Sequence, residues 1–186
     1  PKVSLVFGLF QMMSDDPRYD GKDIGPSVGI DWNQSVYERL LKYDFIACSS
    51  VMINLSIIKS EEHFFDEDLK LAFAEDWDLW LRMAKHGLIG FISQRLGLYR
   101  MHELNNSWNL ERLDRAIAVI EKHQEMGFVD SSEADRAKAN IYFTVAWSIS
   151  DQEALKAKKL FRQGRHLSQK FSTIFWINFL GQCLMA

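Results

Sequence analysis

The sequence predicts an α/β domain followed by an all-helical extension. Two apolar runs that contain β-branched residues, 3–10 and 45–58, are typical of buried strands, and segments with apolar residues at helical spacing lie between and after them. From about residue 109 onward the helical spacing continues, and no segment of comparable strand character follows. We therefore predict an α/β part over residues 1–108 and a helical extension over residues 109–186.

Composition places the chain among globular proteins. Hydrophobic residues make up 47% and charged residues 25% of the 186 residues, which favours a packed core. The net charge of −3 gives no overall attraction to nucleic acid, so no nucleic-acid partner is expected. Cys48 and Cys183 lie far apart without metal-type spacing, which suits a reducing cytoplasm. No apolar run reaches the roughly 18 residues of a membrane span.

The α/β part is predicted to alternate extended and helical segments. The strand at 3–10 leads into a turn that is rich in Ser, Asp, Pro and Gly. Apolar side chains at helical spacing then indicate a helix. The later elements are a strand followed by a short helix or turn in 45–58, a helix over about 75–87, and two short extended segments in 88–102 on either side of Gln94 and Arg95.

The helical extension is predicted to form a small bundle or an array of helical hairpins. Its first helix carries apolar residues at helical spacing from Leu110 and ends at Met126-Gly127-Phe128. A second helix opens at Ser132, a plausible N-cap, and runs to Ile149. A third runs from Asp151 to about Leu167, and a fourth, short and apolar, begins near Ser172.

The stretch AEDWDLWLRMAKHG, residues 74–87, allows two interpretations. Its acidic residues stand where a first helical turn favours negative charge, and Arg82, Lys85 and His86 stand where a last turn favours positive charge. Gly87 is placed as the glycine that ends the helix. A well-capped, buried helix explains most of this peptide. The alternative is that Glu75 and Asp76 carry out chemistry.

The surroundings of this stretch favour chemistry. Several short motifs follow one another in a specific order: Phe65-Asp66-Glu67, Glu75-Asp76, Trp77 to Arg82, Tyr99-Arg100, His102, Asn105 or Asn106, and Ser107. Together they resemble the second half of the catalytic domain of family 2 glycosyltransferases, which have the GT-A fold. The resemblance implies an incomplete GT-A-like sheet and transfer of a sugar, with inversion, from a nucleotide-diphospho-sugar to a hydroxyl of a glycan, lipid-linked or other acceptor.

The resemblance implies that Asp76 is the catalytic base and that Glu75 orients Asp76 or a loop amide. An acceptor hydroxyl is a poor nucleophile, and a carboxylate within hydrogen-bond reach can take its proton as it attacks the anomeric carbon. A base at a helix N-terminus would also lie at the rim of the sheet, where α/β proteins bind ligands.

The resemblance also implies a donor side and an acceptor side of the site. His102 would complete a site for the donor diphosphate or for Mg²⁺ or Mn²⁺; alternatively it is a loop histidine bonded to backbone. Arg100 would offset diphosphate charge, or pair with an acid of the Phe65-Asp66-Glu67 turn. Trp77 and Trp80 would offer an aromatic platform to an acceptor sugar, whereas core packing is the alternative for at least one of them.

Two elements of the family have no match in this chain. They are the N-terminal strand–helix unit that binds the nucleotide and the Asp-X-Asp metal motif that follows a strand. Ser14-Asp15-Asp16 lies within a turn and is interpreted as turn chemistry. Because the chain opens at Pro1 almost directly on a core strand, we expect a fragment of a larger enzyme. The fragment should be inactive alone and should bind no cofactor tightly.

Two rival interpretations concern partners. The helical extension could be an interaction module on an α/β scaffold, and an exposed sheet edge could support a homo-oligomer. Between 156 and 170 the chain has six basic residues and no acidic one, and an apolar tail follows. Residues 156–186 could therefore contact the inner face of a membrane peripherally, as a cytoplasmic protein would. Alternatively, the basic face is solvated and the tail packs in the bundle.

Overall fold

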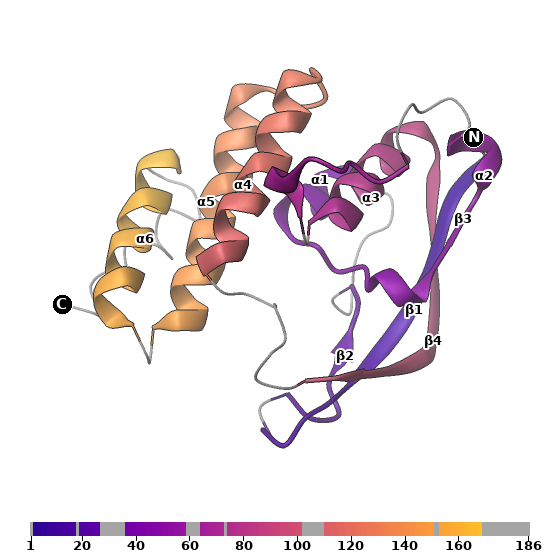
Figure 1. Cartoon of the computed structure of the whole chain (residues 1–186), viewed down its shortest axis with the longest axis horizontal. Helices are drawn as coiled ribbons and strands as arrows, with labels where there is room; N and C mark the ends of the chain where they lie inside the picture. The colour runs from indigo at the N-terminus through magenta and orange to yellow at the C-terminus, as the bar shows by residue number, and fades with distance from the viewer. Residues whose placement is uncertain are drawn as a thin grey trace. The chain divides into compact units, whose positions relative to one another are not determined.

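The computed structural model describes residues 2–17, 19–26, 36–58, 64–72, 74–101, 110–150 and 153–168. The chain divides into two compact units (Figure 1). The α/β unit consists of Pro1–Glu67 and Glu75–Asn105, and the helical unit of Asp68–Ala74 and Asn106–Ala186. The segment Asp68–Ala74, with its short 3-10 helix η2 (Leu69–Leu71), therefore groups with the helices, although the boundary predicted at residue 108 assigns it to the α/β part.

The α/β unit is built on a mixed four-stranded sheet, which confirms the α/β class. Strand β1 (Val3–Met13) pairs with all three other strands. It is antiparallel to β2 (Asp23–Ile24) and β3 (Val51–Ile53) and parallel to β4 (Leu88–Arg100). The predicted strand at 3–10 is thus confirmed and continues to Met13. The GT-A identity of this sheet stays a prediction.

Two helices pack together beside the sheet. Helix α1 (Val36–Lys42) contacts α3 (Glu75–His86), and α3 contacts both β1 and β4 (Figure 1). Leu5 and Phe7 alternate along β1, so both point to the same side of the sheet, where each is 1% exposed. The Phe7 ring lies 5.9 Å from that of Phe45 and 5.2 Å from that of Phe91. These contacts form the core that supports α3.

Residues 88–100 form one strand, although two short segments were predicted. The register against β1 shifts once near its start, between Val3 and Leu5, and twice more in succession further along. In these later shifts Gly8 pairs with Ile92, Leu9 with Arg95, and Phe10 with Gly97. The irregularity around residues 93–94 coincides with the predicted break. A Cβ on Gly8 would lie 2.4 Å from Leu96 Cδ1, so the absent side chain gives the Leu96 side chain its room. Strand β4 is paired with β1 on both sides of these shifts, so it continues as one strand.

The predicted strand within 45–58 is much shorter than expected. Cys48–Ser50 form a 3-10 turn, η1, in which the Ser50 amide donates to the Ala47 carbonyl at 2.8 Å. Only Val51–Ile53 pair with β1. The short helix expected after the strand is confirmed as α2 (Leu55–Ile58). Cys48 lies in this turn, before the paired residues of β3, and belongs to the site described below.

The helical unit contains α4 (Leu110–Glu125), α5 (Ser131–Ile149) and α6 (Ala154–Leu167), which pack in chain order. The predicted end of α4 is confirmed, since Gly127 has a φ of +70° in the turn that follows it. Among the helices of the described residues, none combines the length and the apolar character that crossing a membrane requires. The predicted opening at Asp151 and the tail from Ser172 lie outside the described residues.

The predicted N-cap of α5, Ser132, is wrong. Asp130 caps the helix: its Oδ1 accepts from the Glu133 amide at 2.8 Å. Glu133 Oε2 in turn accepts from the Asp130 amide at 3.3 Å. This reciprocal pair is a capping box, which satisfies two amide donors at once and so fixes the start of the helix two residues earlier than predicted.

Candidate functional site

The site lies at the N-terminus of α3, the helix predicted from residues 74–87. Its first turn holds Glu75, Asp76 and Asp78, and its last turn Lys85 and His86, so the charges complement the helix dipole at both ends. Gly87 directly follows the helix, as predicted, and it is not among the described glycines with positive φ, which are Gly21 and Gly127. A Cβ on Gly87 would lie 2.5 Å from the Lys2 carbonyl oxygen, so close packing against β1 requires glycine.

The connection between α3 and β4 sets the direction in which α3 points. Only Gly87 separates α3 from β4, so the helix runs back along the strand that it precedes (Figure 1). The N-terminus of α3 therefore lies toward the carboxyl ends of the parallel strands β1 and β4. In α/β proteins this is the side of the sheet on which ligands bind.

Glu75 and Asp76 are both half-buried in this turn. Asp76 Oδ1 accepts from the Trp77 amide at 2.8 Å. The residue before the helix is Ala74, which has no side-chain oxygen, so Asp76 lies inside the first turn and does not occupy the N-cap position. Glu75 Oε2 is shielded from solvent and has no hydrogen-bond donor among the described residues. A shielded carboxylate oxygen favours a nearby O–H or N–H group.

The Cys48 thiol lies within electrostatic range of Glu75, Asp76 and Asp44. Although part of the Cys48 side chain is exposed, neighbouring atoms shield the thiol and raise its pKa. The negative charges of Asp76, Glu75 and Asp44 raise this pKa further. We call these four side chains the acidic cluster. Asp44 and Cys48 are separated from α3 along the chain by β3 and α2. No local pattern in the sequence therefore connects them with Glu75 and Asp76.

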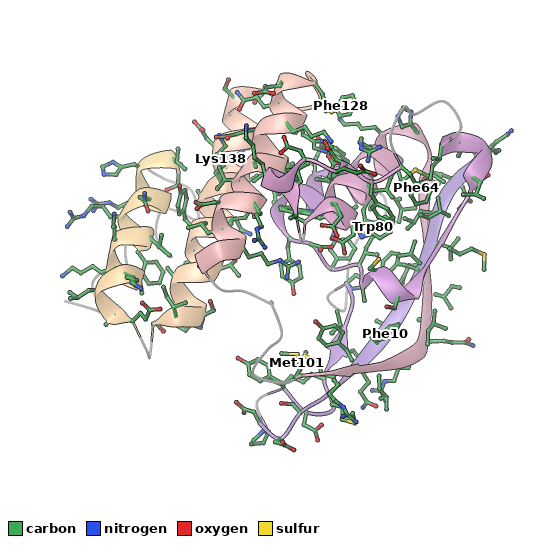
Figure 2. All side chains as sticks on the ribbon, viewed as in Figure 1. Phe10, Phe64, Trp80, Met101, Phe128 and Lys138 are labelled. Atoms are coloured by element: carbon green, nitrogen blue, oxygen red, sulfur yellow. The ribbon has the colours of Figure 1, made fainter. Side chains whose placement is uncertain are left out.

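The two tryptophans belong to the core, which corrects the expectation of a platform for an acceptor sugar. Trp77 is 4% exposed, and its Nε1 donates to the Leu40 carbonyl in α1 at 2.7 Å. Trp80 is 1% exposed, and Figure 2 shows it inside the α/β unit. Neither ring presents a face to a ligand. Their apolar surface instead anchors α3, and with it the acidic cluster, on α1 and the sheet.

A buried ion pair holds α3 to the segment that precedes it. Arg82 Nε donates to Asp78 Oδ2 at 2.9 Å, one turn earlier in the helix. Arg82 Nη2 also donates to the Phe64 carbonyl at 3.0 Å. Phe64 directly precedes the Phe65-Asp66-Glu67 motif, so this bond joins two of the motifs that sequence alone could only order. The sequence pattern predicted only that these charges complement the helix dipole; that Arg82 pairs with Asp78 instead of standing in the last turn is seen in the structure.

The predicted donor-side residues lie at or beyond the end of β4. Arg100 is exposed at the last position of β4, opposite Met13 in β1. His102 lies outside the described residues. Among the described residues, no three His, Cys, Asp or Glu side chains gather in a way that could hold a metal ion. The described donor set alone therefore does not form a metal site, and a Mg²⁺ or Mn²⁺ site that includes His102 stays a prediction.

No protein-family model, curated protein or solved structure matches the chain. Function is therefore inferred from the α/β fold, from the place of Glu75 and Asp76 in it, and from the order of the sequence motifs.

Proposed function

We propose that the α/β part, residues 1–108, is the acceptor-side part of an inverting glycosyltransferase in which Asp76 is the catalytic base. The observation that carries this proposal is the position of Asp76. Asp76 is half-buried and lies in the first turn of α3, the end of the helix that points toward the carboxyl ends of β1 and β4. A half-buried carboxylate can still be reached by a substrate hydroxyl, from which it can take a proton as a general base.

The proposed reaction is a single displacement. The acceptor hydroxyl transfers its proton to the Asp76 carboxylate while its oxygen forms a bond to the anomeric carbon of the donor sugar. The bond from that carbon to the diphosphate oxygen breaks, and the nucleoside diphosphate leaves with the electron pair. Attack from the face opposite the leaving group inverts the anomeric configuration.

Glu75 assists by orienting the acceptor or the base. Its shielded Oε2 oxygen offers an acceptor for a second substrate hydroxyl or for a loop amide. Two buried side chains of α3 keep both carboxylates in place. Trp77 donates a hydrogen bond to the Leu40 carbonyl, and Arg82 donates one to the Phe64 carbonyl. A rigid support of this kind is what a catalytic group requires in order to stay within reach of its proton.

The donor contacts come mainly from elements outside this chain. Arg100 and His102 are proposed to face the nucleotide diphosphate, where Arg100 offsets negative charge on the leaving group. A bound Mg²⁺ or Mn²⁺ ion would supply further charge neutralisation there, with His102 as one ligand. The acceptor is a hydroxyl compound, whether glycan or lipid-linked, and the enzyme is proposed to act in the cytoplasm.

The substitution Asp76→Asn tests the proposal in the enzyme that carries this chain. Asn keeps the shape of the side chain but cannot take a proton, so the rate of nucleoside diphosphate release from uridine or thymidine diphospho-sugars with acceptor should fall by about 10²–10⁴-fold. Donor affinity should hardly change. The matched control is Glu38→Gln, which removes one exposed carboxylate from α1. Near-normal turnover by a folded Asp76→Asn enzyme would overturn the proposal and leave α3 as a buried helix alone.

A further inference from the structure

One face of α6 is basic and opposite to the face that packs in the helical unit. The packed face consists of Ala157, Leu160, Phe161 and Gly164, and the Phe161 ring lies 5.7 Å from the Phe143 ring in α5. The basic residues of the helix, which contains no acidic residue, all lie outside this packed face: Lys156, Lys158, Lys159, Arg162, Arg165 and His166.

Most of this positive charge has no ion-pair partner within the part of the chain that the structure describes. Lys156 pairs with Glu153, just before the helix. For Lys158, Lys159, Arg162 and Arg165, no ion pair with a described residue is found. Since the whole chain has a net charge of −3, the rest of the molecule is net acidic. The electrostatic potential around α6 is therefore positive, whereas the rest of the molecule carries net negative charge. This asymmetry would turn α6 toward an anionic surface.

Two large apolar side chains lie exposed near the connection between α5 and α6. Leu155, in the first turn of α6, is 87% exposed, and Trp147, near the end of α5, is 58% exposed. The Glu153 amide donates to the Ile149 carbonyl at 2.8 Å, which holds the end of α5 beside the start of α6. Trp147, near the end of α5, and Leu155, at the start of α6, therefore belong to the same end of the α5–α6 hairpin.

We propose that the basic face of α6, together with Leu155 and Trp147, docks the protein on the surface of a bilayer that contains anionic lipid. Lysine and arginine are attracted to the negative surface potential of such a bilayer, and Leu and Trp side chains enter the boundary between headgroups and acyl chains. A nucleic acid or an acidic protein would match the charge but would leave the exposed apolar pair without a role. This inference is independent of the proposed catalytic function.

Vesicle flotation of the 186-residue chain tests the docking surface. The probes are vesicles of phosphatidylcholine alone and of phosphatidylcholine mixed with phosphatidylglycerol. We expect binding to the mixed vesicles only, and we expect it to be lost at about 0.5 M salt, where charges are screened within a few ångströms. Equal binding to neutral vesicles, or binding to an oligonucleotide but not to the mixed vesicles, would overturn the proposal.

Substitutions locate the surface on α6. The double variant Lys159→Gln with Arg162→Gln should weaken partitioning by about 25-fold, or about fivefold for each charge removed. Both side chains are exposed, so the fold should be kept, as circular dichroism will check. The matched control is Arg136→Gln with Lys22→Gln, which removes the same charge elsewhere from exposed positions and should leave partitioning nearly unchanged. Equal losses in the two double variants would contradict a site on α6.

A truncation separates α6 from the apolar tail that follows it in sequence. Residues 170–186 include no residue of α6 and neither of the two exposed apolar residues, so the shortened chain still contains all of them. We expect the shortened chain to retain salt-sensitive binding to mixed vesicles. Complete loss of that binding would show that the tail, and not the basic face, contacts the bilayer.

Discussion

Arg82 Nε lies 2.9 Å from Asp78 Oδ2 inside α3, with exposed fractions of 5% for the arginine side chain and 0% for the aspartate side chain. The same guanidinium donates to the Phe64 carbonyl, so one buried cation satisfies a carboxylate and a backbone oxygen together. A charge removed from water to this extent is stable only while its partner remains.

The buried pair predicts a large and asymmetric loss of stability. Asp78→Ala should lower the free energy of unfolding by about 3–5 kcal/mol, because it leaves the Arg82 charge buried without its carboxylate. The double variant Asp78→Leu with Arg82→Met should recover much of this loss, since it removes both charges and restores apolar volume. Urea denaturation measures the free energy of unfolding of the unsubstituted protein, the single variant and the double variant.

The matched control for the buried pair is an exposed one. Arg95 Nε lies 2.8 Å from Asp23 Oδ1, but these side chains are 55% and 37% exposed. Arg95→Gln should therefore cost at most about 1 kcal/mol, since water and salt already screen the pair. If Asp78→Ala cost no more than Arg95→Gln, the Asp78–Arg82 pair would not stabilise α3.

The capping box of α5 predicts different effects for two neighbouring polar residues. Asp130→Ala should destabilise the protein by about 0.5–2 kcal/mol, because its side chain satisfies the Glu133 amide. Ser132→Ala should be almost neutral, since Ser132 lies exposed within the first turn. Thermal unfolding of the two variants measures the difference. A larger loss from Ser132→Ala would restore Ser132 as the cap.

The acidic cluster predicts a slow thiol at Cys48. Shielding from water and the charges of Asp76, Glu75 and Asp44 raise the Cys48 pKa, so the reactive thiolate is scarce near neutral pH. Alkylation of Cys48 by iodoacetamide at pH 8 should be slower than that of an unfolded chain. Asp76→Asn or Glu75→Gln should each speed it. Peptide mass spectrometry follows Cys48 separately from Cys183.

The control and the pH dependence follow from the same charges. Glu38→Gln, on the exposed side of α1, should leave the alkylation rate unchanged, and an effect as large as that of Asp76→Asn would contradict the cluster. Because the folded-state pKa of Cys48 is above the unfolded one, its contribution to stability is fully present below the ordinary thiol pKa of about 8.5. That contribution is lost as the pH rises through the raised value.

The proposed division of labour predicts weak donor binding by this chain alone. Calorimetry of the 186-residue chain with uridine and thymidine diphospho-sugars, in the presence of Mg²⁺ or Mn²⁺, should show little heat, because the nucleotide-binding unit of the family has no match in this sequence. Titration of the enzyme that carries this chain serves as the positive control. Micromolar binding by the chain alone would mean that the donor site lies within these residues.

Periodicity and charge in the sequence were sufficient to predict α3, α4 and the core of β1. Helix α3 begins at Glu75 and ends at His86, as its apolar spacing and terminal charges indicated, and α4 ends where Gly127 was expected to end it. These features are local, since each depends on residues within a few positions of one another. The same information could not decide between Asp130 and Ser132, because both are good caps and only the bonded geometry separates them.

The sequence by itself determined that the chain forms an α/β part and a helical part and that carboxylates begin α3. The tertiary structure decided which distant residues meet them. It brought Asp44 and Cys48 to Glu75 and Asp76, buried Trp77 and Trp80, and paired Arg82 with the Phe64 carbonyl. Local patterns describe how one segment folds, whereas shielding and charge at a site depend on segments that only the packed sheet and helices bring into contact.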